Sequence, residues 1–295
     1  MATISCVMIT RNCINQGYPF KQAIAASLPL CDEFIVVDGL STDGTFEVLR
    51  SLRNSKIKIF QDEWSDHGKK SEVIRDAINH AIGRASGNYI FHVDANEIID
   101  PEALERIREL PIVFPETTLF ALPYYQFMGK YLFNEEFRIR FGKKSSSIVS
   151  VDDGWTLGTK IGGMDFLKRI LHPGSYMSAL YNFTGNLYFP SYFRYVHLPK
   201  PIFRYYSIDP ELLLTKLESR SRIHSGEWSL FSKTNPRIMD MLTRYGSTKD
   251  KDNFWRSMCE YFYELKRAGH VVPKEVIEWK YFATKLHPSV IQDLL

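Results

Sequence analysis

The first 110 residues alternate between short apolar runs and longer amphipathic stretches. Runs typical of β-strands lie at residues 4–9, 34–37, 57–60 and 89–93. Between them, apolar residues recur at helical spacing in the stretches 20–28, 45–52 and 68–84. The run at 34–37 shows no polar alternation, as expected of a strand that is covered on both faces. This order predicts an α/β fold built on a parallel sheet with right-handed crossovers.

A further helix is expected to begin at Pro101. Asp100 is a residue type that caps helices, and proline favours the first helical turn. Leu104 and Ile107 are then expected to face inward, because they lie three residues apart.

The pattern changes after Pro111. Residues 118–127 and 137–141 are expected to form strands, and the stretch that follows them is rich in loops, glycine and aromatic residues. From Pro210 the chain is expected to be helical, ending in a helix at 273–286. One helical face carries an apolar stripe, formed by Phe254, Met258, Tyr261, Phe262 and Leu265.

The composition narrows the classes of function. Of the 295 residues, 44% are hydrophobic and 24% are charged, which is ordinary for a soluble globular protein. A formal net charge of +3 shows no large excess of basic residues of the kind typical of nucleic-acid-binding proteins. No apolar run approaches the roughly 20 residues that span a bilayer, and residues 1–10 lack the basic start of a signal peptide.

The four cysteines are expected to be reduced thiols. Cys6, Cys13, Cys31 and Cys259 form no CxxC pair, so a zinc site is not indicated. We therefore expect a cytoplasmic location for the chain.

Polar residues follow the predicted strands in three motifs: VMITRN at 7–12, FIVVDGLSTDGT at 34–45 and NYIFHVDANE at 88–97. Ligands of open α/β sheets bind beyond the carboxyl ends of the strands. Thr10, Asp38 and Asp94 each lie at such an end, so we expect three strands to deliver polar groups to one crevice. Two simpler alternatives are that Asp38 starts a turn and that Ser41 to Asp43 cap a helix.

In this order the three motifs resemble those of the inverting glycosyltransferase family 2, whose members have the GT-A fold. The resemblance covers residues 3–110. It implies a Rossmann-like mixed sheet flanked by helices, in which Asp38 contacts the nucleoside of a nucleotide-sugar donor. It also implies that Thr10, Arg11 and Asn12 line the same pocket.

In the family, the DxD element contacts the donor and a divalent cation. The resemblance therefore implies that Asp94 and Ala95 bind the donor and that the enzyme uses Mn²⁺ or Mg²⁺. This chain has Asn96 where the second Asp is usual. An amide oxygen can bind a cation but brings no negative charge, and Glu97 is the residue that would compensate. His197 is the histidine we expect as a further ligand, with His92 and His172 as alternatives.

Basic residues near the diphosphate are expected among Lys69, Lys70 and Arg75, although a solvated helix face would carry the same residues. An inverting transferase also needs a general base for the acceptor hydroxyl. The acids available after DxD favour Asp153 as that base, followed by Asp165 and Asp152.

These features predict three parts in the chain: a nucleotide-sugar-binding half at 1–110, an acceptor-side half of the same domain at 111–207, and a C-terminal helical extension at 208–295. The expected reaction moves a sugar from a nucleotide-diphosphate donor, with UDP favoured, to a glycan, a lipid-linked acceptor or another hydroxyl. Two alternatives are an inactive nucleotide-sugar-binding protein of the same fold and a transferase acting on modified DNA bases. Aromatic residues of the extension, including Trp255 and Trp279, suit a peripheral membrane contact or a homodimer face.

The residues that follow the first predicted strand argue against two other classes of nucleotide-binding enzyme. Thr10 to Cys13 replaces the glycine-rich loop of sugar nucleotidyltransferases, and no GxGxxG follows that strand, as a dinucleotide-dependent oxidoreductase would require.

Overall fold

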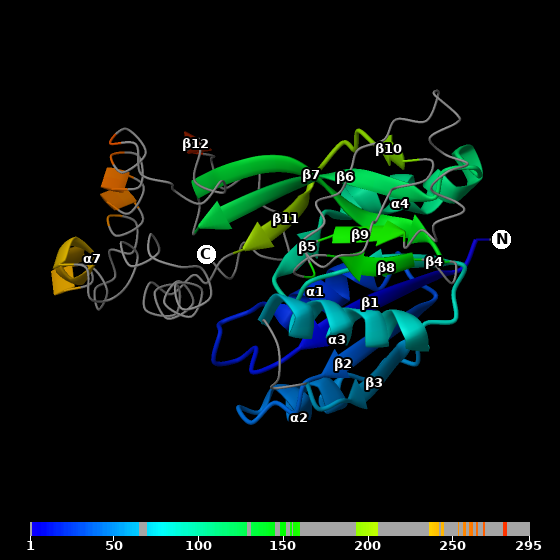
Figure 1. The fold of residues 1–295 in the computed structure, drawn as a ribbon, viewed down its shortest axis with the longest axis horizontal. Helices are drawn as coiled ribbons and strands as arrows, with labels where there is room; N and C mark the ends of the chain where they lie inside the picture. Colours follow the sequence, from blue (N-terminus) through cyan, green and yellow to red (C-terminus); the bar gives the residue numbers. More distant parts are fainter. Residues whose placement is uncertain are drawn as a thin grey trace.

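A mixed β-sheet with helices on both faces forms the body of the protein, as seen in a computed structural model (Figure 1). The structure describes residues 2–64, 70–128, 131–144, 148–151, 154, 156–159, 193–205, 236–241, 243–244 and 280–281, and a few positions between 253 and 268. Within this part of the chain, no helix combines the length and the apolar character that a membrane span requires.

Four parallel strands form the N-terminal half of the sheet. Strand β1 (Ile4–Thr10) lies between β2 (Glu33–Asp38) and β4 (Tyr89–His92), and β3 (Ile57–Gln61) pairs with the outer edge of β2. Every residue of β2 is buried, which explains its continuous apolar run. The four strands predicted in this half are confirmed.

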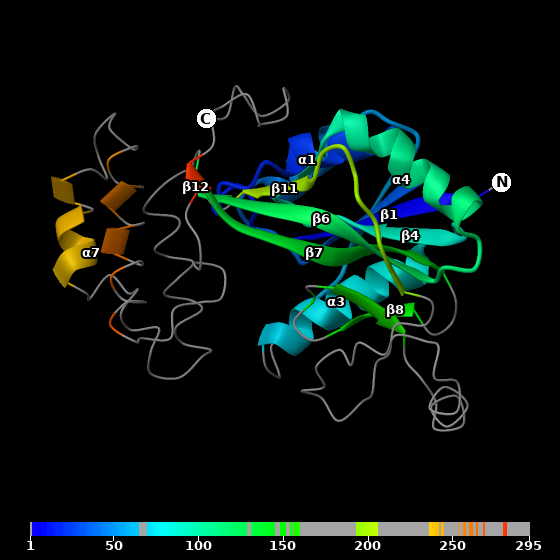
Figure 2. The same ribbon diagram turned by 90° about the horizontal axis from the view of Figure 1, so that it is seen from above.

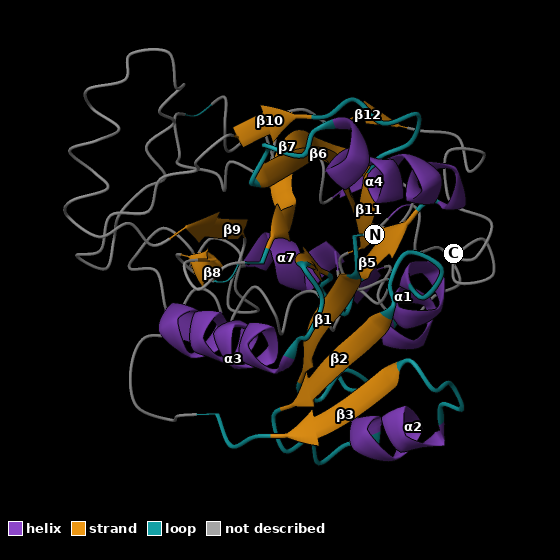
Figure 3. Ribbon diagram, turned by 90° about the vertical axis from the view of Figure 1, so that its right-hand side faces the viewer, coloured by secondary structure: helices purple, strands orange, loops and turns teal. Residues whose placement is uncertain are grey.

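Helices cover both faces of these strands (Figure 3). Helix α3 (Lys70–Arg84) lies on one face, and α1 (Phe20–Ser27) and α2 (Thr45–Ser51) lie on the other. Each face has its own apolar core, and Ile78 of α3 and Ile24 of α1 belong to different cores. The sheet is therefore a central layer between two helical layers.

Helix α4 (Pro101–Val113) begins as the sequence predicts. The Asp100 carboxylate accepts a hydrogen bond of 2.9 Å from the backbone N–H of Glu102, and Ile107 is fully buried. The helix continues through Pro111 to Val113, so the change of pattern expected after Pro111 comes two residues late.

Strands in both parallel and antiparallel pairings extend the sheet beyond β4. Strand β7 (Tyr131–Lys143) pairs with β4 and with β6 (Leu119–Met128), and β11 (Ile202–Tyr205) then joins β6 to β5 (Glu97–Ile99). The strand predicted at 118–127 coincides with β6 to within one residue, the one at 137–141 lies within β7, and the short β5 and β11 were missed. The β6–β7 hairpin projects well past the parallel strands, on the side of their carboxyl ends (Figure 2).

Three further short strands were also missed. Strand β10 (Phe193–Tyr195) adds to β6, and β8 (Ile148–Val151) pairs with β9 (Thr156–Thr159) in a separate two-stranded sheet. This small sheet is anchored to α3, because the side-chain amide of Asn79 makes hydrogen bonds with both the N–H and the carbonyl of Ser150, at 2.7 and 3.2 Å.

The C-terminal extension is described only in part. Helix α7 (Pro236–Met241) agrees with the expected helical content, but β12 (Lys280–Tyr281) pairs with the tip of β7 where a helix was predicted. The strand pairing supplies these two residues with hydrogen bonds that a helix would have made internally. Of the predicted apolar stripe, Tyr261 is described and buried; the other members, and Trp255 and Trp279, lie outside the described residues.

These observations confirm the predicted α/β fold class, a mixed sheet flanked by helices. The proposed boundary between the two halves, at residues 110 and 111, falls inside α4. The halves share one sheet through the β4–β7 pairing, which is consistent with two halves of a single domain.

Candidate functional site

Asp38 anchors the carboxyl end of β2. Its side chain is fully buried and accepts hydrogen bonds from the Thr10 hydroxyl at 3.0 Å, the Ser41 N–H at 2.9 Å and the Ser41 hydroxyl at 2.6 Å. The side-chain amide of Gln61 donates a fourth, at 3.3 Å. Asp38 thus joins the ends of β1, β2 and β3, which places the predicted nucleoside contact at the centre of this edge.

The loops after β1 and β2 are tied to each other. The Asn12 N–H donates to the Ser41 hydroxyl, and the Thr42 N–H donates to Asn12 Oδ1, each at 2.8 Å. Asn12 and Leu40 have positive φ angles of 52° and 53°. Such a φ is costly for leucine, so the loops hold a backbone strain of the kind that clusters at ligand sites.

Asp43 fixes the start of α2. Its carboxylate accepts hydrogen bonds from the Thr45 N–H at 3.0 Å and the Thr45 hydroxyl at 2.6 Å, and from the Asn15 N–H at 2.8 Å. Burial alone would raise the pKa of Asp43, but these hydrogen bonds lower it. The N-cap residue of α2 is Gly44, so Asp43 holds the loop before the helix to its first residue, Thr45, without being the cap itself.

Trp64 covers the backbone where β2 ends. A Cβ atom built on Gly39 would lie 2.5 Å from Trp64 Cε2, so the indole rests directly on the glycine. The guanidinium of Arg11 lies 5.5 Å from the centroid of the indole. This aromatic platform could not be predicted, because Trp64 follows β3 in a short polar stretch and not in one of the three motifs.

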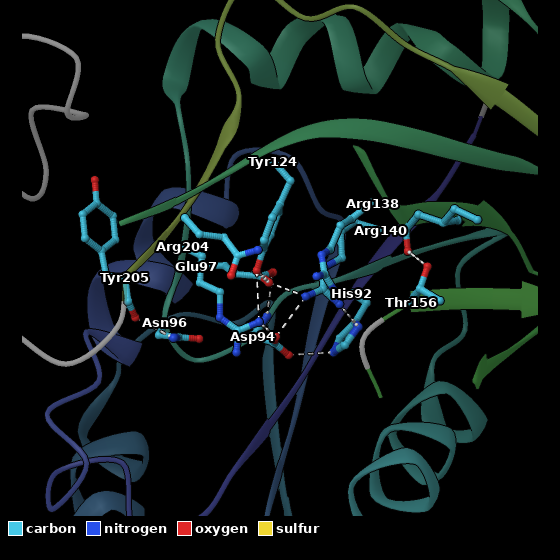
Figure 4. A network of polar contacts seen from close by, with 12 residues as sticks. His92, Asp94, Asn96, Glu97, Tyr124, Arg138, Arg140, Thr156, Arg204 and Tyr205 are labelled. Carbon is cyan, nitrogen blue, oxygen red and sulfur yellow. Dashed lines mark hydrogen bonds and ion pairs between the residues drawn. The ribbon is translucent and has the colours of Figure 1, made fainter. Parts of the chain in front are cut away.

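Asp94 belongs to a buried network of charged and polar side chains (Figure 4). Its Oδ2 accepts a hydrogen bond of 2.9 Å from Arg140 Nη2 and lies 3.6 Å from Arg204 Nη1. Asp94 retains 23% exposure of its side chain, whereas Val93, Ala95, Asn96 and Glu97 are all buried. Within this segment, only Asp94 can meet a ligand directly.

Arg140 reaches the network because of a β-bulge. Phe120 pairs with Phe141, and the next residue of β6, Ala121, pairs with Ile139, so Arg140 is the extra residue of β7. Its side chain is fully buried and donates to Asp94, Glu97 and His92. Burial by itself would lower the pKa of Arg140, but the carboxylates of Glu97 and Asp94 raise it above its ordinary value.

His92 bridges Arg140 and Asp94. Arg140 Nη1 lies 2.8 Å from His92 Nδ1, and His92 Nε2 lies 3.2 Å from Asp94 Oδ1. The imidazole is fully buried, so its two nitrogens face these two partners inside the protein.

The pKa of Asp94 reflects this environment. Burial would raise it, but the guanidinium of Arg140, the imidazole of His92 and the guanidinium of Arg204 together lower the pKa well below its usual range. Asp94 is thus a carboxylate at any physiological pH.

Glu97 and Asn96, two of the predicted cation ligands, are engaged inside the protein. Glu97 is 1% exposed, pairs with Arg140 and accepts a hydrogen bond of 2.5 Å from the Tyr124 hydroxyl. Asn96 is 2% exposed, and its Nδ2 donates to the carbonyl of Tyr205 at 2.6 Å. Their side chains are therefore part of the scaffold under Asp94.

His197 is not brought to Asp94. It is exposed and lies edge-on to Phe137, with 5.6 Å between ring centroids. The next residue of β7, Arg138, stacks on Tyr124. Because successive side chains of a strand point to opposite faces, His197 lies across the sheet from Tyr124 and the network.

The predicted diphosphate contacts begin helix α3. This helix runs from the carboxyl edge of the sheet back to β4, so Arg75 lies near that edge, in an ion pair of 2.8 Å with Asp76. The helix begins at Lys70, whose side chain lies outside the described residues, as does Lys69.

The predicted general bases, Asp152, Asp153 and Asp165, also lie outside the described residues. Their neighbour Gly154 rests on α3, since a Cβ on it would lie 2.6 Å from Ile74. Ser150 contacts Asn79, further along the same helix. From Ser150 to Gly154, the chain therefore advances along α3 toward the carboxyl edge, where Asp38 lies.

Several site residues had no signal in the sequence motifs. Arg140, Arg204 and Tyr124 come from β7, β11 and β6, far along the chain from Asp94. Arg140 lies in the alternating run FRIRF at 137–141, where its position matches that of Arg138, so the sequence does not distinguish it. Within the described part of the chain, no group of three or more His, Cys, Asp or Glu is placed to hold a metal ion.

Comparison with known proteins identifies the family. The family model "Glycosyl transferase family 2" matches residues 5–171, more than half of the chain. The chain therefore belongs to glycosyl transferase family 2, and it is a glycosyltransferase. No curated protein matches it.

Solved structures include distant neighbours. S. aureus TarS (residues 1–349) aligns over 88% of this chain and 80% of its own, with a TM-score of 0.42 and 13% identity. Mannosyl-3-phosphoglycerate synthase from Rubrobacter xylanophilus aligns over 42% of this chain and 40% of its own, with a TM-score of 0.32 and 22% identity. Glucosyl-3-phosphoglycerate synthase from Mycobacterium tuberculosis, in complex with Mn²⁺, UDP and phosphoglyceric acid, covers 43% of each chain, with a TM-score of 0.31 and 21% identity.

Proposed function

We propose that the protein transfers a sugar from a nucleoside-diphosphate donor, UDP-sugar being favoured, to a hydroxyl group of a glycan, a lipid-linked molecule or another acceptor. The observation that carries this proposal is the edge at which Thr10, Asn12 and Ser41 are joined around Asp38, beside the accessible carboxylate of Asp94. In the proposed arrangement, the nucleoside lies against the joined loops and the diphosphate points toward Asp94.

The chemistry of this edge suits such a donor. Ribose and sugar hydroxyls can donate to the carboxylate of Asp94, which is ionised and held by Arg140. Arg11 and Trp64 offer a cation and an aromatic face at the mouth of the same edge. Loops fixed by internal hydrogen bonds lose little freedom when a ligand binds, which favours affinity.

For the acceptor step we propose an inverting reaction with Asp153 as the general base. The position of Gly154 against α3 favours Asp153 and Asp152 over Asp165, since the chain approaches the carboxyl edge there. Asp153→Asn is expected to lose transfer and to keep nucleotide affinity. Transfer that persists in this variant and fails in Asp165→Asn would assign the base to Asp165.

The first experiment is a binding screen of the purified full chain. UDP, GDP, TDP and CMP are tested by thermal shift and calorimetry, each with Mn²⁺ and with EDTA. Stabilisation by one nucleotide is expected, because a ligand that binds only the folded state raises its stability by about 2.7 kcal/mol at a hundredfold excess over Kd. Absence of binding by every nucleotide under both conditions would overturn the proposal.

The residue to substitute for an activity test is Asp94. A strand-end carboxylate contributes little to most cores, but here removal of the charge in Asp94→Ala would unbalance the buried guanidinium of Arg140. Asp94→Asn keeps the shape and is expected to abolish donor turnover, with loss of fold checked by circular dichroism. Full activity in this variant would remove Asp94 from the site.

An inactive nucleotide-sugar-binding relative is the second candidate, because Asn96 replaces the usual acid. It binds the nucleotide in the same screen but releases no free sugar or transferred sugar from the donor. Measuring hydrolysis of the donor in the absence of acceptor distinguishes the two.

A further inference from the structure

We propose that Asn79 of α3 is a positioning residue for the acceptor step, and that it acts by holding the turn between β8 and β9 in place. The proposal rests on the proposed function, because that turn carries Asp153, the proposed general base. In this step the acceptor hydroxyl gives its proton to the base while its oxygen bonds to the anomeric carbon of the sugar, and the bond from that carbon to the diphosphate breaks. The base must therefore stand within hydrogen-bond reach of the acceptor.

Asn79 ties the backbone of β8 to helix α3. Its side-chain Oδ1 accepts a hydrogen bond of 2.7 Å from the Ser150 N–H, and its Nδ2 donates to the Ser150 carbonyl at 3.2 Å. The amide thus pairs with both backbone groups of one residue, as a neighbouring strand would. Ser150 is fully buried, so removal of the amide would leave its N–H and its carbonyl without this partner inside the protein.

A second anchor lies four residues further on, at Gly154. The Gly154 N–H donates to the Val151 carbonyl at 3.0 Å, which closes the turn. The φ angle of Gly154 is 87°, a value that favours glycine. A Cβ atom at this position would lie 2.6 Å from Ile74 Cγ2 and 2.8 Å from Ile78 Cδ1. Glycine therefore lets the turn rest directly on α3.

The two anchors enclose two of the predicted bases. Asp152 and Asp153 stand between Val151 and Gly154 in the chain, and their own placement lies outside the described residues. Because α3 holds the chain before and after these acids, a change at either anchor would shift where the acids stand relative to the sheet.

Strand β9 leads from this turn to the network around Asp94. The Thr156 hydroxyl donates to the Ile139 carbonyl at 3.4 Å (Figure 4). The next residue of β7 is Arg140, which donates to Asp94. The turn is thus tied to α3 and, two residues after Gly154, to the strand that carries Arg140. Its position is therefore set relative to the carboxylate that we propose for the donor.

The test separates the chemical step from donor binding in the full chain. Turnover is measured as release of UDP from UDP-glucose, UDP-galactose or UDP-N-acetylglucosamine with water as the acceptor, in Mn²⁺ and in EDTA; GDP-sugars replace them if the binding screen selects GDP. Asn79→Ala should lower kcat for the donor that the wild-type protein consumes by about tenfold to a hundredfold, because a misplacement of about 1 Å can cost that much. Its Kd for UDP, measured by calorimetry, should stay within about twofold of the wild-type value.

A double-mutant cycle shows whether Asn79 acts through the base. Removal of a general base costs about a hundredfold to ten-thousandfold, so Asp153→Asn should retain a small rate that can be measured with more protein. In this background Asn79→Ala should lower the rate further by less than about threefold, because a carboxylate that is absent cannot be misplaced. A residue with only a structural role would give the same loss of rate in both backgrounds.

His80→Gln is the matched control, because His80 is the next residue of α3 and has an exposed side chain that lies 3.6 Å from Asp62. Its kcat and its Kd for UDP should both equal the wild-type values. Gly154→Ala reaches the same turn from the other anchor, and it should lower kcat without weakening UDP. Thermal unfolding followed by circular dichroism shows that each variant is folded at the temperature of the assay.

Three results would overturn the inference and leave the transferase proposal intact. They are a wild-type kcat in folded Asn79→Ala or Gly154→Ala, an equal loss of rate in both backgrounds of the cycle, and a tenfold or greater weakening of UDP in Asn79→Ala. A wild-type protein that binds a nucleotide but consumes none of these donors would instead refute the proposed transfer reaction, and the inference with it.

Discussion

Replacing Arg140 by methionine tests the buried network most directly. Methionine keeps much of the side-chain volume but leaves Glu97 and Asp94 without the guanidinium that both contact. Breaking a buried pair by removing one partner costs about 3–5 kcal/mol, because the remaining charge is buried and uncompensated. For a domain of this size, that is on the order of 10 °C in Tm.

A double-mutant cycle separates this charge effect from a loss of packing. Glu97→Gln removes one of the two carboxylates, so it should be less destabilising, or even stabilising, in the Arg140→Met background than in the wild-type protein. The assay is thermal and urea unfolding of the four proteins, followed by circular dichroism. The surface pair Arg106–Glu109, at 4.0 Å with side chains 67% and 47% exposed, provides the control; Arg106→Gln should change stability by less than about 1 kcal/mol.

Two results would refute this reasoning. One is a cost below about 1 kcal/mol for Arg140→Met, since that is the range of exposed pairs. The other is additivity of the two substitutions, which would mean that Arg140 and Glu97 do not depend on each other in the folded protein.

Three further predictions concern residues outside this pair. Burial would raise the pKa of Glu33, but Lys58 and neighbouring hydrogen-bond donors lower it to about 2. Its contribution to the stability of the folded protein is therefore complete above pH 4.5 and is lost as the pH falls toward 2. Glu33→Gln should make the decline of Tm over that pH range less steep. Gly39→Ala should cost about 1–3 kcal/mol and shift tryptophan fluorescence, because its Cβ would meet the Trp64 indole at 2.5 Å, whereas Gly83→Ala, with no atom within 4 Å, should not destabilise. Asn96→Asp should lower the free energy of unfolding by about 1–3 kcal/mol, because a carboxylate would face the Tyr205 carbonyl to which Nδ2 now donates. The same substitution should not create Mn²⁺ binding, as measured by the electron paramagnetic resonance signal of free Mn²⁺.

The parallel half of the sheet could be predicted because its information is local. Strands such as β2 are apolar throughout, and the helices between them have apolar residues at regular spacing. The strand ends that carry Thr10, Asp38 and Asp94 follow from this order alone, since parallel strands joined by helices end at one edge.

The short strands could not be predicted because their pairing partners are distant in the sequence. Strand β5 has three residues, and its partner β11 lies about a hundred positions further on. Nothing in Glu97–Ile99 alone distinguishes a strand from the start of a helix. The hydrogen bonds to β11 decide it, and they exist only once the chain has folded.

The same distance explains why the role of the acidic motif could not be derived from its four residues. Asp94 to Glu97 indicates a cation site when considered alone, because two acids and an amide offer oxygen ligands. Arg140 enters through a bulge in β7, and Arg204 enters opposite Glu97 on β11, and both are supplied by strands outside the resemblance. Whether an acid at a strand end attracts a cation or an anion depends on how many positive groups the rest of the sheet turns toward it. In this protein the distant strands place Arg140 and Arg204 at 2.9 and 3.6 Å from Asp94, an environment that the four residues of the motif do not reveal.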